Sequence, residues 1–217
     1  VESARRFSVI TVATGSLLSL VNAFRNSVKA ALAFEVEVAK ISQVTGKTAK
    51  ELGGLTDEVR KLARELGVSN ESLLNTSRIL LQTGLSATKT KQALDVLAKT
   101  TLAATFDNIQ DTTEGAIALL NQFGAEAKKT GNDIVFLEQS LDAINAVSKK
   151  FAVESSDLIG VVRRVGGVFS AAGGDVNELV ALFTSVRQTT RESAETISTG
   201  LRTIFTRLQR TDTVDAL

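Results

Sequence analysis

Apolar residues recur at three- and four-residue spacing along most of the chain, which is the period of an amphipathic α-helix. Between Leu55 and Leu66 charged residues occupy the opposite face, with Asp57 placed four residues before Lys61. A second clear apolar stripe near the end comprises Ala194, Ile197, Leu201, Ile204, Phe205 and Leu208. No stretch alternates apolar and polar residues for long enough to predict a strand. The pattern therefore predicts an all-α protein.

Signals for helix starts and stops divide this pattern into separate elements. Capping boxes are expected at Thr48–Glu51, Asp111–Glu114 and Asp175–Glu178, where the first side chain accepts a backbone N–H and the Glu returns the bond. Gly67 and Gly124 follow apolar runs and favour left-handed helix ends. The predicted helices are 3–45, 48–66 with a break at Gly53-Gly54, 70–83, 87–105, 112–123, 133–150, 155–172, 176–189 and 193–210. We expect an extended multi-helix array in which a long first helix precedes shorter capped helices and helical hairpins.

The sequence predicts two segments, a long apolar helix at residues 1–45 and a region of shorter helices at 46–217. The apolar residues of the long helix keep a seven-residue repeat from Ile10 to Ile41, as in a coiled coil, and its flanking positions favour three or more copies. The predicted oligomer interface consists of Ile10, Ala13, Leu17, Leu20, Phe24, Ala31, Phe34, Val38 and Ile41. Packing against the chain's own later helices fits the same stripe equally well, and the pattern does not decide between them.

Residues 7–24 carry no charged side chain and reach the lower length limit of a membrane-spanning helix. Polar residues such as Ser8 and Asn22 make this segment a poor span, and it lacks the cleavage pattern of a secretory signal. Membrane insertion of residues 7–24 is therefore the less favoured reading.

The composition excludes several classes of catalytic and metal-binding site. Cys and His are absent, which excludes zinc sites built from them and the Ser-His-Asp and Cys-His triads. The formal net charge of +1 gives no overall field that attracts nucleic acid or an anionic membrane. The acid pairs Glu35/Glu37 and Glu192/Glu195 lie on helical segments beside basic residues, so a solvated helix face explains them better than catalysis or metal binding. We predict no enzyme activity, no catalytic or metal-binding residues and no cofactor.

Three further motifs have both a functional and a structural interpretation. Gly46-Lys47-Thr48 matches the end of a phosphate-binding loop, but Ile41 stands where the first Gly belongs, so a turn between helices explains it better. Gly166-Gly167 lies inside a predicted helix and favours either close approach of another helix or a bend. A basic strip of potential nucleic-acid contacts comprises Arg163, Arg164, Arg202, Arg207 and Arg210. Ion pairs within the protein or helix-end complementarity are favoured for these arginines, and no specific nucleic-acid recognition is predicted.

The order of these features resembles a known family. "FEVEVAKISQVTGKTAKELGGLTDEVRKLARELGVSNESLLNTSRILLQTGLS", "LAATFDNIQDTTEGAIALLNQFG" and "GVFSAAGGDVNELVALFTSVRQTTRESAETISTGLRTIFTRL" are similar to the core region of tail tape measure proteins of tailed phages and prophages. The resemblance covers residues 33–208 and rests on helix patterns rather than catalytic signatures. One departure is the turn "RQTTRES", where the family often has more glycine.

The resemblance implies a structural, oligomeric protein that sets tail length, scaffolds tail-tube assembly and is released at genome ejection. Its implied partners are further copies of itself, tail-tube proteins, tail-tip or baseplate hub proteins and tail assembly chaperones. Its implied location is the tube lumen of the virion tail near the tip, and the host cytoplasm during assembly. The alternative function is a membrane-active helical protein that inserts residues 7–24 into the host inner membrane to aid genome delivery.

Overall fold

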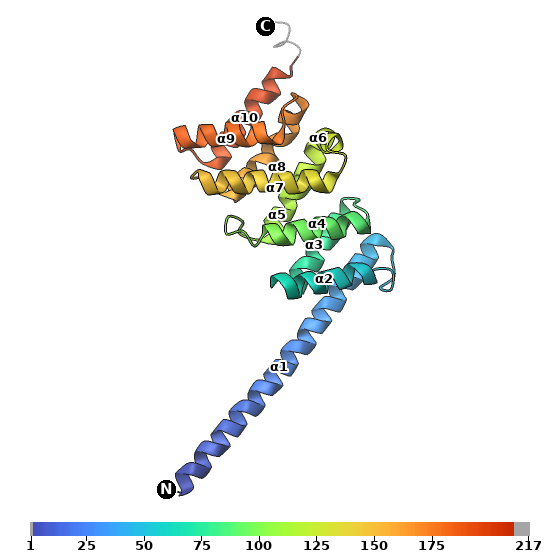
Figure 1. The fold of residues 1–217 in the computed structure, drawn as a ribbon, viewed down its shortest axis with the longest axis vertical. Coiled ribbons are helices and arrows are strands. Elements are labelled where there is room, and N and C mark those ends of the chain that lie inside the picture. Colours follow the sequence, from blue (N-terminus) through green and yellow to red (C-terminus); the bar gives the residue numbers. More distant parts are fainter. Residues whose placement is uncertain (1, 211–217) are drawn as a thin grey trace.

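The structure is a computed structural model that describes the backbone of residues 2–210 and the side chains of Ser19 and residues 21–210. Every regular element in that part of the chain is an α-helix, as the apolar periodicity predicts. In chain order the helices are α1 (Glu2–Thr45), α2 (Gly53–Leu66), α3 (Asn70–Gln82), α4 (Ala87–Thr100), α5 (Ile109–Gln122), α6 (Gly124–Lys129), α7 (Asp133–Lys150), α8 (Ser155–Ala171), α9 (Val176–Thr190) and α10 (Ala194–Leu208). The long helix α1 projects from a stack of the other helices, and α10 lies at the far end of that stack (Figure 1).

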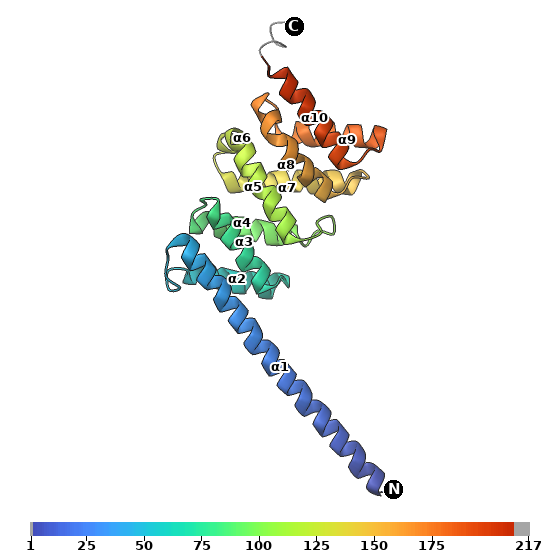
Figure 2. The ribbon, with the colours of Figure 1, turned by 180° about the vertical axis from the view of Figure 1, so that it is seen from behind.

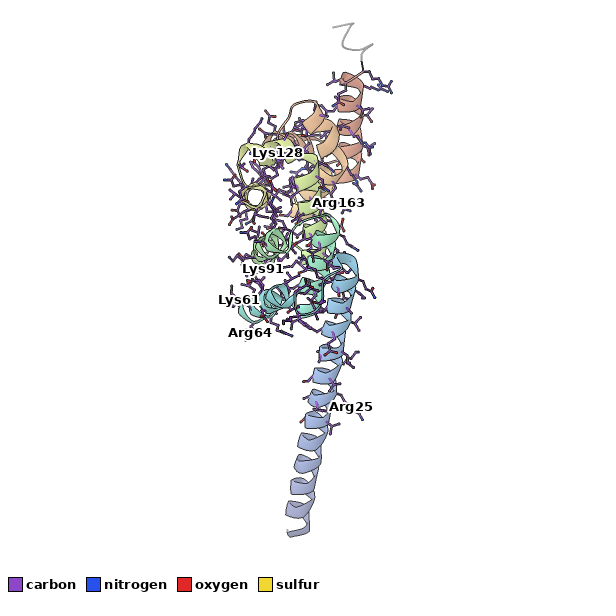
Figure 3. The ribbon with its side chains drawn as sticks, turned by 90° about the vertical axis from the view of Figure 1, so that its right-hand side faces the viewer. Arg25, Lys61, Arg64, Lys91, Lys128 and Arg163 are labelled. Atoms are coloured by element: carbon purple, nitrogen blue, oxygen red, sulfur yellow. The ribbon has the colours of Figure 1, made fainter. Side chains whose placement is uncertain are left out.

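The stack consists of two columns of helices. In the first column α1 packs on α3, α3 on α5, α5 on α8 and α8 on α10, and this column lies toward the viewer in Figure 2. In the second column α2 packs on α4, α4 on α7 and α7 on α9. A side view separates the columns, with Lys61 and Lys91 on the second column and Arg25 and Arg163 on the first (Figure 3). Such two-layer stacking of helix pairs is the arrangement of α-solenoids.

One continuous apolar core runs along the stack between the columns. Leu73 of α3, Leu97 of α4, Leu119 of α5, Leu137 of α7 and Val162 of α8 are all 0% exposed. The same cluster includes buried residues from each of the helices α1 to α10. Because the helices of the stack, α2 to α10, are covered by their neighbours, stability in such an array depends on successive helix–helix interfaces.

Helix ends follow the sequence signals at several points. Asp175 forms the predicted capping box at the start of α9, and Gly67 ends α2 in the left-handed conformation with φ 73°. The predicted bonds at Thr48 also form, since its N–H donates to a Glu51 carboxylate oxygen at 2.8 Å and its hydroxyl accepts the Glu51 N–H at 3.4 Å. These bonds close an isolated turn, because α2 begins only at Gly53. The predicted start of this helix is therefore wrong.

The prediction is also wrong in the region from α4 to α6. Helix α4 ends at Thr100 rather than at residue 105, and α5 begins at Ile109 rather than at residue 112. Asn108 is the N-cap in place of Asp111, because its side-chain oxygen accepts the Asp111 N–H at 2.8 Å. Gly124 does not end a helix but is the first residue of α6, which was not predicted. Its six residues are too few to show a helical period.

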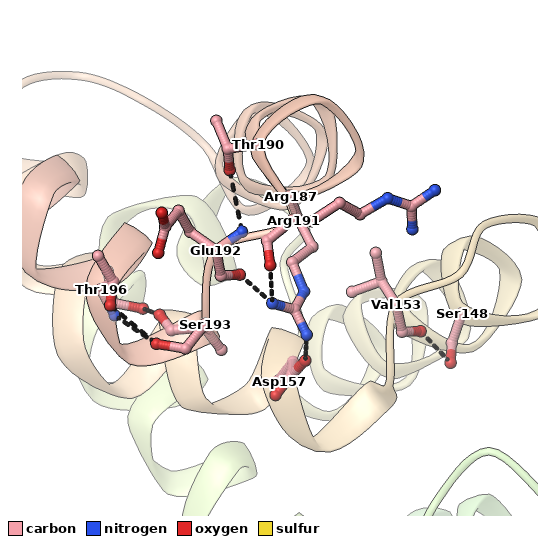
Figure 4. Close-up of polar contacts among 11 residues, drawn as sticks. Ser148, Val153, Asp157, Arg187, Thr190, Arg191, Glu192, Ser193 and Thr196 are labelled. Carbon is pink, nitrogen blue, oxygen red and sulfur yellow. Dashed lines mark hydrogen bonds and ion pairs between the residues drawn. The ribbon is translucent and has the colours of Figure 1, made fainter.

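The turn between α9 and α10 places a residue other than glycine in the left-handed region. Arg191 has φ 59° there. The Arg187 guanidinium donates to the backbone carbonyls of Arg191, at 3.4 Å, and of Glu192, and its other terminal nitrogen lies 3.6 Å from an Asp157 carboxylate oxygen (Figure 4). Left-handed backbone costs a residue with a side chain about 1–2 kcal/mol. The bonds from Arg187 offset this strain and explain how the turn forms without glycine.

Candidate oligomer interface on the first helix

The nine residues of the predicted interface occupy different environments. Four of them lie outside the residues whose side chains are described, namely Ile10, Ala13, Leu17 and Leu20. Phe24 is 71% exposed and Ala31 is also exposed. Phe34 and Val38 are half-buried and pack against the core, and Ile41 is 0% exposed. The predicted seam therefore changes its surroundings along the helix.

The last part of α1 belongs to the chain's own stack. Ile41 lies in the core where α1 packs on α3, and Phe34 carries the guanidinium of Arg60 over its ring at 4.6 Å from the centroid. For Phe34, Val38 and Ile41 the structure describes packing within the chain, which was the alternative that the pattern left open. A straight helix drifts by about 20° per heptad, so a register that starts at Ile10 turns toward the stack by Ile41.

A second apolar face of α1 remains bare. Val21, Phe24, Val28, Leu32 and Val36 are 47%, 71%, 43%, 57% and 53% exposed, and we call them the exposed α1 stripe. Successive helical residues turn by about 100°, so Leu32 and Ile41 point about 180° apart. The stripe thus faces away from the stack. The heptad register missed Leu32 and Val36, although their i, i+4, i+8 spacing with Val28 was a signal that pointed to them.

A hollow of mixed polarity lies at the junction of α1 and α2. It has a volume of about 500 Å³, and its lining combines the apolar residues Phe34, Val38, Ala39 and Ala49 with Glu35, Ser42, Thr56 and Arg60. Ala39 follows Leu32 by seven residues, which places the two about 20° apart around the helix. The bare side of α1 therefore continues into a concave surface that can receive a partner's side chain.

Charged residues at the base of α1 hold the joint between helices. Glu37 is 9% exposed, pairs with Lys40 on its own helix, and has a carboxylate oxygen 3.8 Å from Arg78 Nε on α3. Glu35 remains exposed, so the acid pair noted in the sequence points in two directions. In the second pair, a Glu195 oxygen lies 3.2 Å from a terminal nitrogen of Arg164. Within the described residues no group of three or more potential ligands is placed to hold a metal ion.

The Gly46-Lys47-Thr48 motif forms the turn that follows α1. Gly46 has φ 66°, and the Ser42 hydroxyl donates to the backbone carbonyl of Lys47. The Thr48 hydroxyl donates to the Glu51 carboxylate at 2.7 Å. These bonds close the chain on itself, as expected for a turn between helices rather than a loop that cradles a phosphate.

A membrane-spanning helix is not found among the described residues, since none of their helices has the required length and hydropathy. Most of residues 7–24 lie outside the described side chains. Insertion of this segment therefore stays a prediction.

Comparison with known proteins concerns the region that follows α1. Residues 46–217 match a family model described as phage-related minor tail protein. No solved structure matches the chain. The matched region contains α2 to α10 and forms most of the chain. This match supports a protein of the phage tail but does not specify a tape measure protein. This chain therefore belongs to the family of phage-related minor tail proteins.

Proposed function

We propose that this protein is the tape measure of a phage tail, which sets tail length and scaffolds assembly of the tail tube. Membership in the minor tail protein family supports a structural role in the tail. The observation that carries the finer proposal is α1, a helix of 44 residues that projects from the stack with a bare apolar stripe. An α-helix rises about 1.5 Å per residue, so α1 extends for about 66 Å. A rigid helix converts chain length into distance, which is the physical requirement for a molecular ruler.

The exposed α1 stripe is the proposed contact between copies of the protein. Burying a Val, Leu or Phe side chain completely contributes about 1.5–3 kcal/mol, and the five partly exposed residues of the stripe supply a share of this when covered. No charged residue lies between positions 7 and 24, so parallel copies meet there without like-charge repulsion. A bundle of three or more helices suits this broad apolar surface. Ile10, Ala13, Leu17 and Leu20 extend the proposed contact toward the N-terminal end.

The proposed setting of this bundle is the lumen of the tail tube near the tip. The other proposed partners are tail-tube subunits, tail-tip or baseplate hub proteins and tail assembly chaperones, with release from the tail at genome ejection. The family supports contacts with other tail components. The elongated form, in which α1 and the two-column stack lie end to end, supports a place along a tube (Figure 1).

Tail length measured by electron microscopy tests the ruler. A phage carrying a duplication of residues 3–30, which preserves the heptad register, is expected to build tails longer by about 42 Å. A duplication of the same size placed after residue 217 controls for added mass, because the inserted residues there do not lengthen α1. Complete tails of unchanged length from the first variant would overturn the ruler role while leaving a structural role in place.

Membrane insertion is the second candidate function, and the uncharged run at residues 7–24 favours it. Flotation of the protein with liposomes tests this, using the whole chain and a variant that lacks residues 7–24. Insertion predicts that only the whole chain floats. Equal flotation of both proteins would exclude membrane insertion through residues 7–24.

A further inference from the structure

Arginine side chains gather at the end of the stack that lies opposite α1. Arg164 of α8 and Arg202, Arg207 and Arg210 at α10 line an open hollow of about 480 Å³, and we call them the α10 arginine face. The other described residues of the lining are Ser198, Thr199, Thr203 and Thr206. No Asp or Glu is among these lining residues. Since the whole chain carries a formal net charge of only +1, this face is a local concentration of positive charge.

Ion pairs within the protein account for only part of these arginines. A terminal nitrogen of Arg164 lies 3.2 Å from a Glu195 oxygen, and the neighbouring Arg163 lies 4.0 Å from Glu114. Among the described residues, Arg202, Arg207 and Arg210 have no carboxylate within ion-pair distance. Complementarity with the helix C-terminus applies to Arg207 and Arg210 but not to Arg202, which lies in the middle of α10. Within residues 21–210, these three guanidinium groups are thus exposed and lack an acidic partner.

The arginines are spaced to follow one side of α10. Arg202 and Arg210 are eight residues apart, which is about 12 Å at the helical rise. Helix α10 ends at Leu208, and the Arg210 N–H donates to the Arg207 carbonyl at 3.1 Å in the turn that follows. Phosphates of one nucleic-acid strand advance about 3.4 Å per nucleotide, so this span covers three to four phosphates. Around the helix, Ile204 lies about 160° from Arg202 but only about 60° from Arg207, and Leu208 lies about 160° from Arg210 and about 100° from Arg207. Neither apolar residue lines the hollow.

The chemistry of the hollow matches phosphate groups. A guanidinium presents a planar fork of N–H donors that fits two phosphate oxygens at once. The hydroxyls of Thr199 and Thr203 donate to the backbone carbonyls of Glu195 and Thr199 at 2.9 and 2.8 Å, so their single protons are already engaged. The arginines are therefore the main donors toward an anion in this hollow.

A protein partner fits this surface less well. Protein–protein interfaces are centred on apolar and aromatic residues, whereas the residues that the structure describes in this lining are all Arg, Ser or Thr. Interfaces with nucleic acid are polar and strongly positive. Because no aromatic ring is present to stack on unpaired bases, the backbone of a duplex is the better match. We propose that the α10 arginine face binds the phosphodiester backbone of double-stranded nucleic acid without reading its sequence. This goes beyond the structural role proposed above.

Fluorescence anisotropy with a labelled DNA duplex of random sequence tests the proposal on the purified full chain. For about three phosphate contacts, log K falls with log salt with a slope of about −2.7, which is about 40-fold between 50 and 200 mM salt. Replacing Arg202, Arg207 and Arg210 by Gln is expected to weaken binding by more than about tenfold and to bring the slope close to zero. The matched control replaces Lys128, Lys129 and Lys149 by Gln, which removes the same charge from α6 and α7 and is expected to leave affinity within about twofold.

Several outcomes would overturn the assignment. Equal loss of affinity in both triple variants would mean that overall charge, rather than this face, attracts the duplex. Binding of poly-glutamate with the same affinity and the same sensitivity to the arginine variant would assign the face to acidic polypeptides. Arginine-dependent flotation with vesicles of phosphatidylcholine and phosphatidylglycerol, without duplex binding, would assign it to membranes. Because the three arginines are exposed, circular dichroism is expected to show unchanged unfolding. If the triple variant unfolds, Arg202→Gln alone is expected to reduce the slope by about one.

Discussion

The ring of Phe205 on α10 meets the ring of Phe169 on α8 edge to face, with centroids 4.7 Å apart and planes at 90°. Phe169 is 7% exposed and Phe205 packs partly buried against the core. Edge-to-face pairs contribute about 0.5–1.5 kcal/mol beyond the burial of their surface. This pair therefore fastens the last helix to the stack and sets the orientation of the arginines that α10 carries.

Shortening Phe205 is expected to loosen α10. Phe205→Ala should lower the free energy of unfolding by about 2 kcal/mol, less than the 3–5 kcal/mol for a completely buried ring because Phe205 is only half-buried. Phe205→Leu keeps most of the volume and should lose about 1 kcal/mol. Urea unfolding followed by circular dichroism measures both, since the chain has no Trp or Tyr for fluorescence. Two variants as stable as the unmodified protein would show that the ring pair does not hold α10.

Gly166 allows α8 to lie against the end of α5, which is the first of the two alternatives that the glycine pair left open, and it applies to Gly166 alone. A Cβ at Gly166 would lie 2.3 Å from Gln122 Oε1 and 2.8 Å from a ring carbon of Phe123, and Phe123 is 0% exposed. Gly166→Ala is therefore expected to lower the free energy of unfolding by about 1–3 kcal/mol.

Gly167→Ala is the matched control in the same helix. Its nearest atoms would lie 4.0 Å away, so the higher helix propensity of Ala should raise the free energy of unfolding by up to about 1 kcal/mol. Thermal unfolding of both proteins gives the comparison. A shift of the same sign in both variants would contradict close packing at Gly166 alone.

Substitution of Ile41 should affect stability, whereas substitution of Leu32 should affect self-association, although both residues lie on one helix. Ile41→Ala removes a side chain that is 0% exposed and should lower the free energy of unfolding by about 2–5 kcal/mol. Leu32→Ser removes a side chain that is 57% exposed and should leave unfolding nearly unchanged while weakening self-association. Light scattering at several protein concentrations measures the mass of the particles. If Leu32→Ser has the same mass as the unmodified protein throughout, the exposed α1 stripe is not the contact between copies.

Two glutamates should change the free energy of unfolding with pH in opposite directions. Burial raises the pKa of Glu126, although its carboxylate accepts the Val176 N–H at 3.3 Å. The backbone N–H of Thr48, followed by its hydroxyl, lowers the pKa of Glu51. A raised carboxyl pKa means that the folded state holds its proton longer than the unfolded state. The stability that Glu126 contributes is therefore present below the ordinary pKa of a glutamate and is lost as the pH rises through the pKa that Glu126 has in the folded state.

For Glu51 the sign is reversed. The stability that Glu51 contributes is present above the ordinary pKa of a glutamate and is lost as the pH falls through the lowered pKa that Glu51 has in the folded state. Urea unfolding over a pH series compares the unmodified protein with Glu126→Gln and Glu51→Gln. Relative to the first variant, the unmodified protein should lose stability with rising pH, and relative to the second it should lose stability with falling pH. Parallel curves for all three proteins would argue against both effects.

Local sequence was sufficient to identify most helices of this protein. Asp175 and Glu178 are three residues apart, so their capping box forms from groups that the chain already holds together. Gly67 ends a helix for an equally local reason, because glycine adopts the left-handed conformation without a steric penalty. The same signals misplaced the start of α5, where Asn108 and Asp111 are both good caps and only one is used.

The partners of each helix face were decided only by the tertiary structure. Phe24 and Ile41 belong to one heptad register, yet the first is 71% exposed and the second is 0% exposed, because α3 lies against the end of α1 and not against its middle. Likewise, Arg164 and Arg202 were equally basic in the sequence, but only Arg164 lies near a carboxylate in the described structure. The chain by itself determined where helices form, since hydrogen bonds and caps join residues about four positions apart. Which apolar or charged faces are covered depends on groups far away in the sequence, and the stacking of the helices brings those groups together.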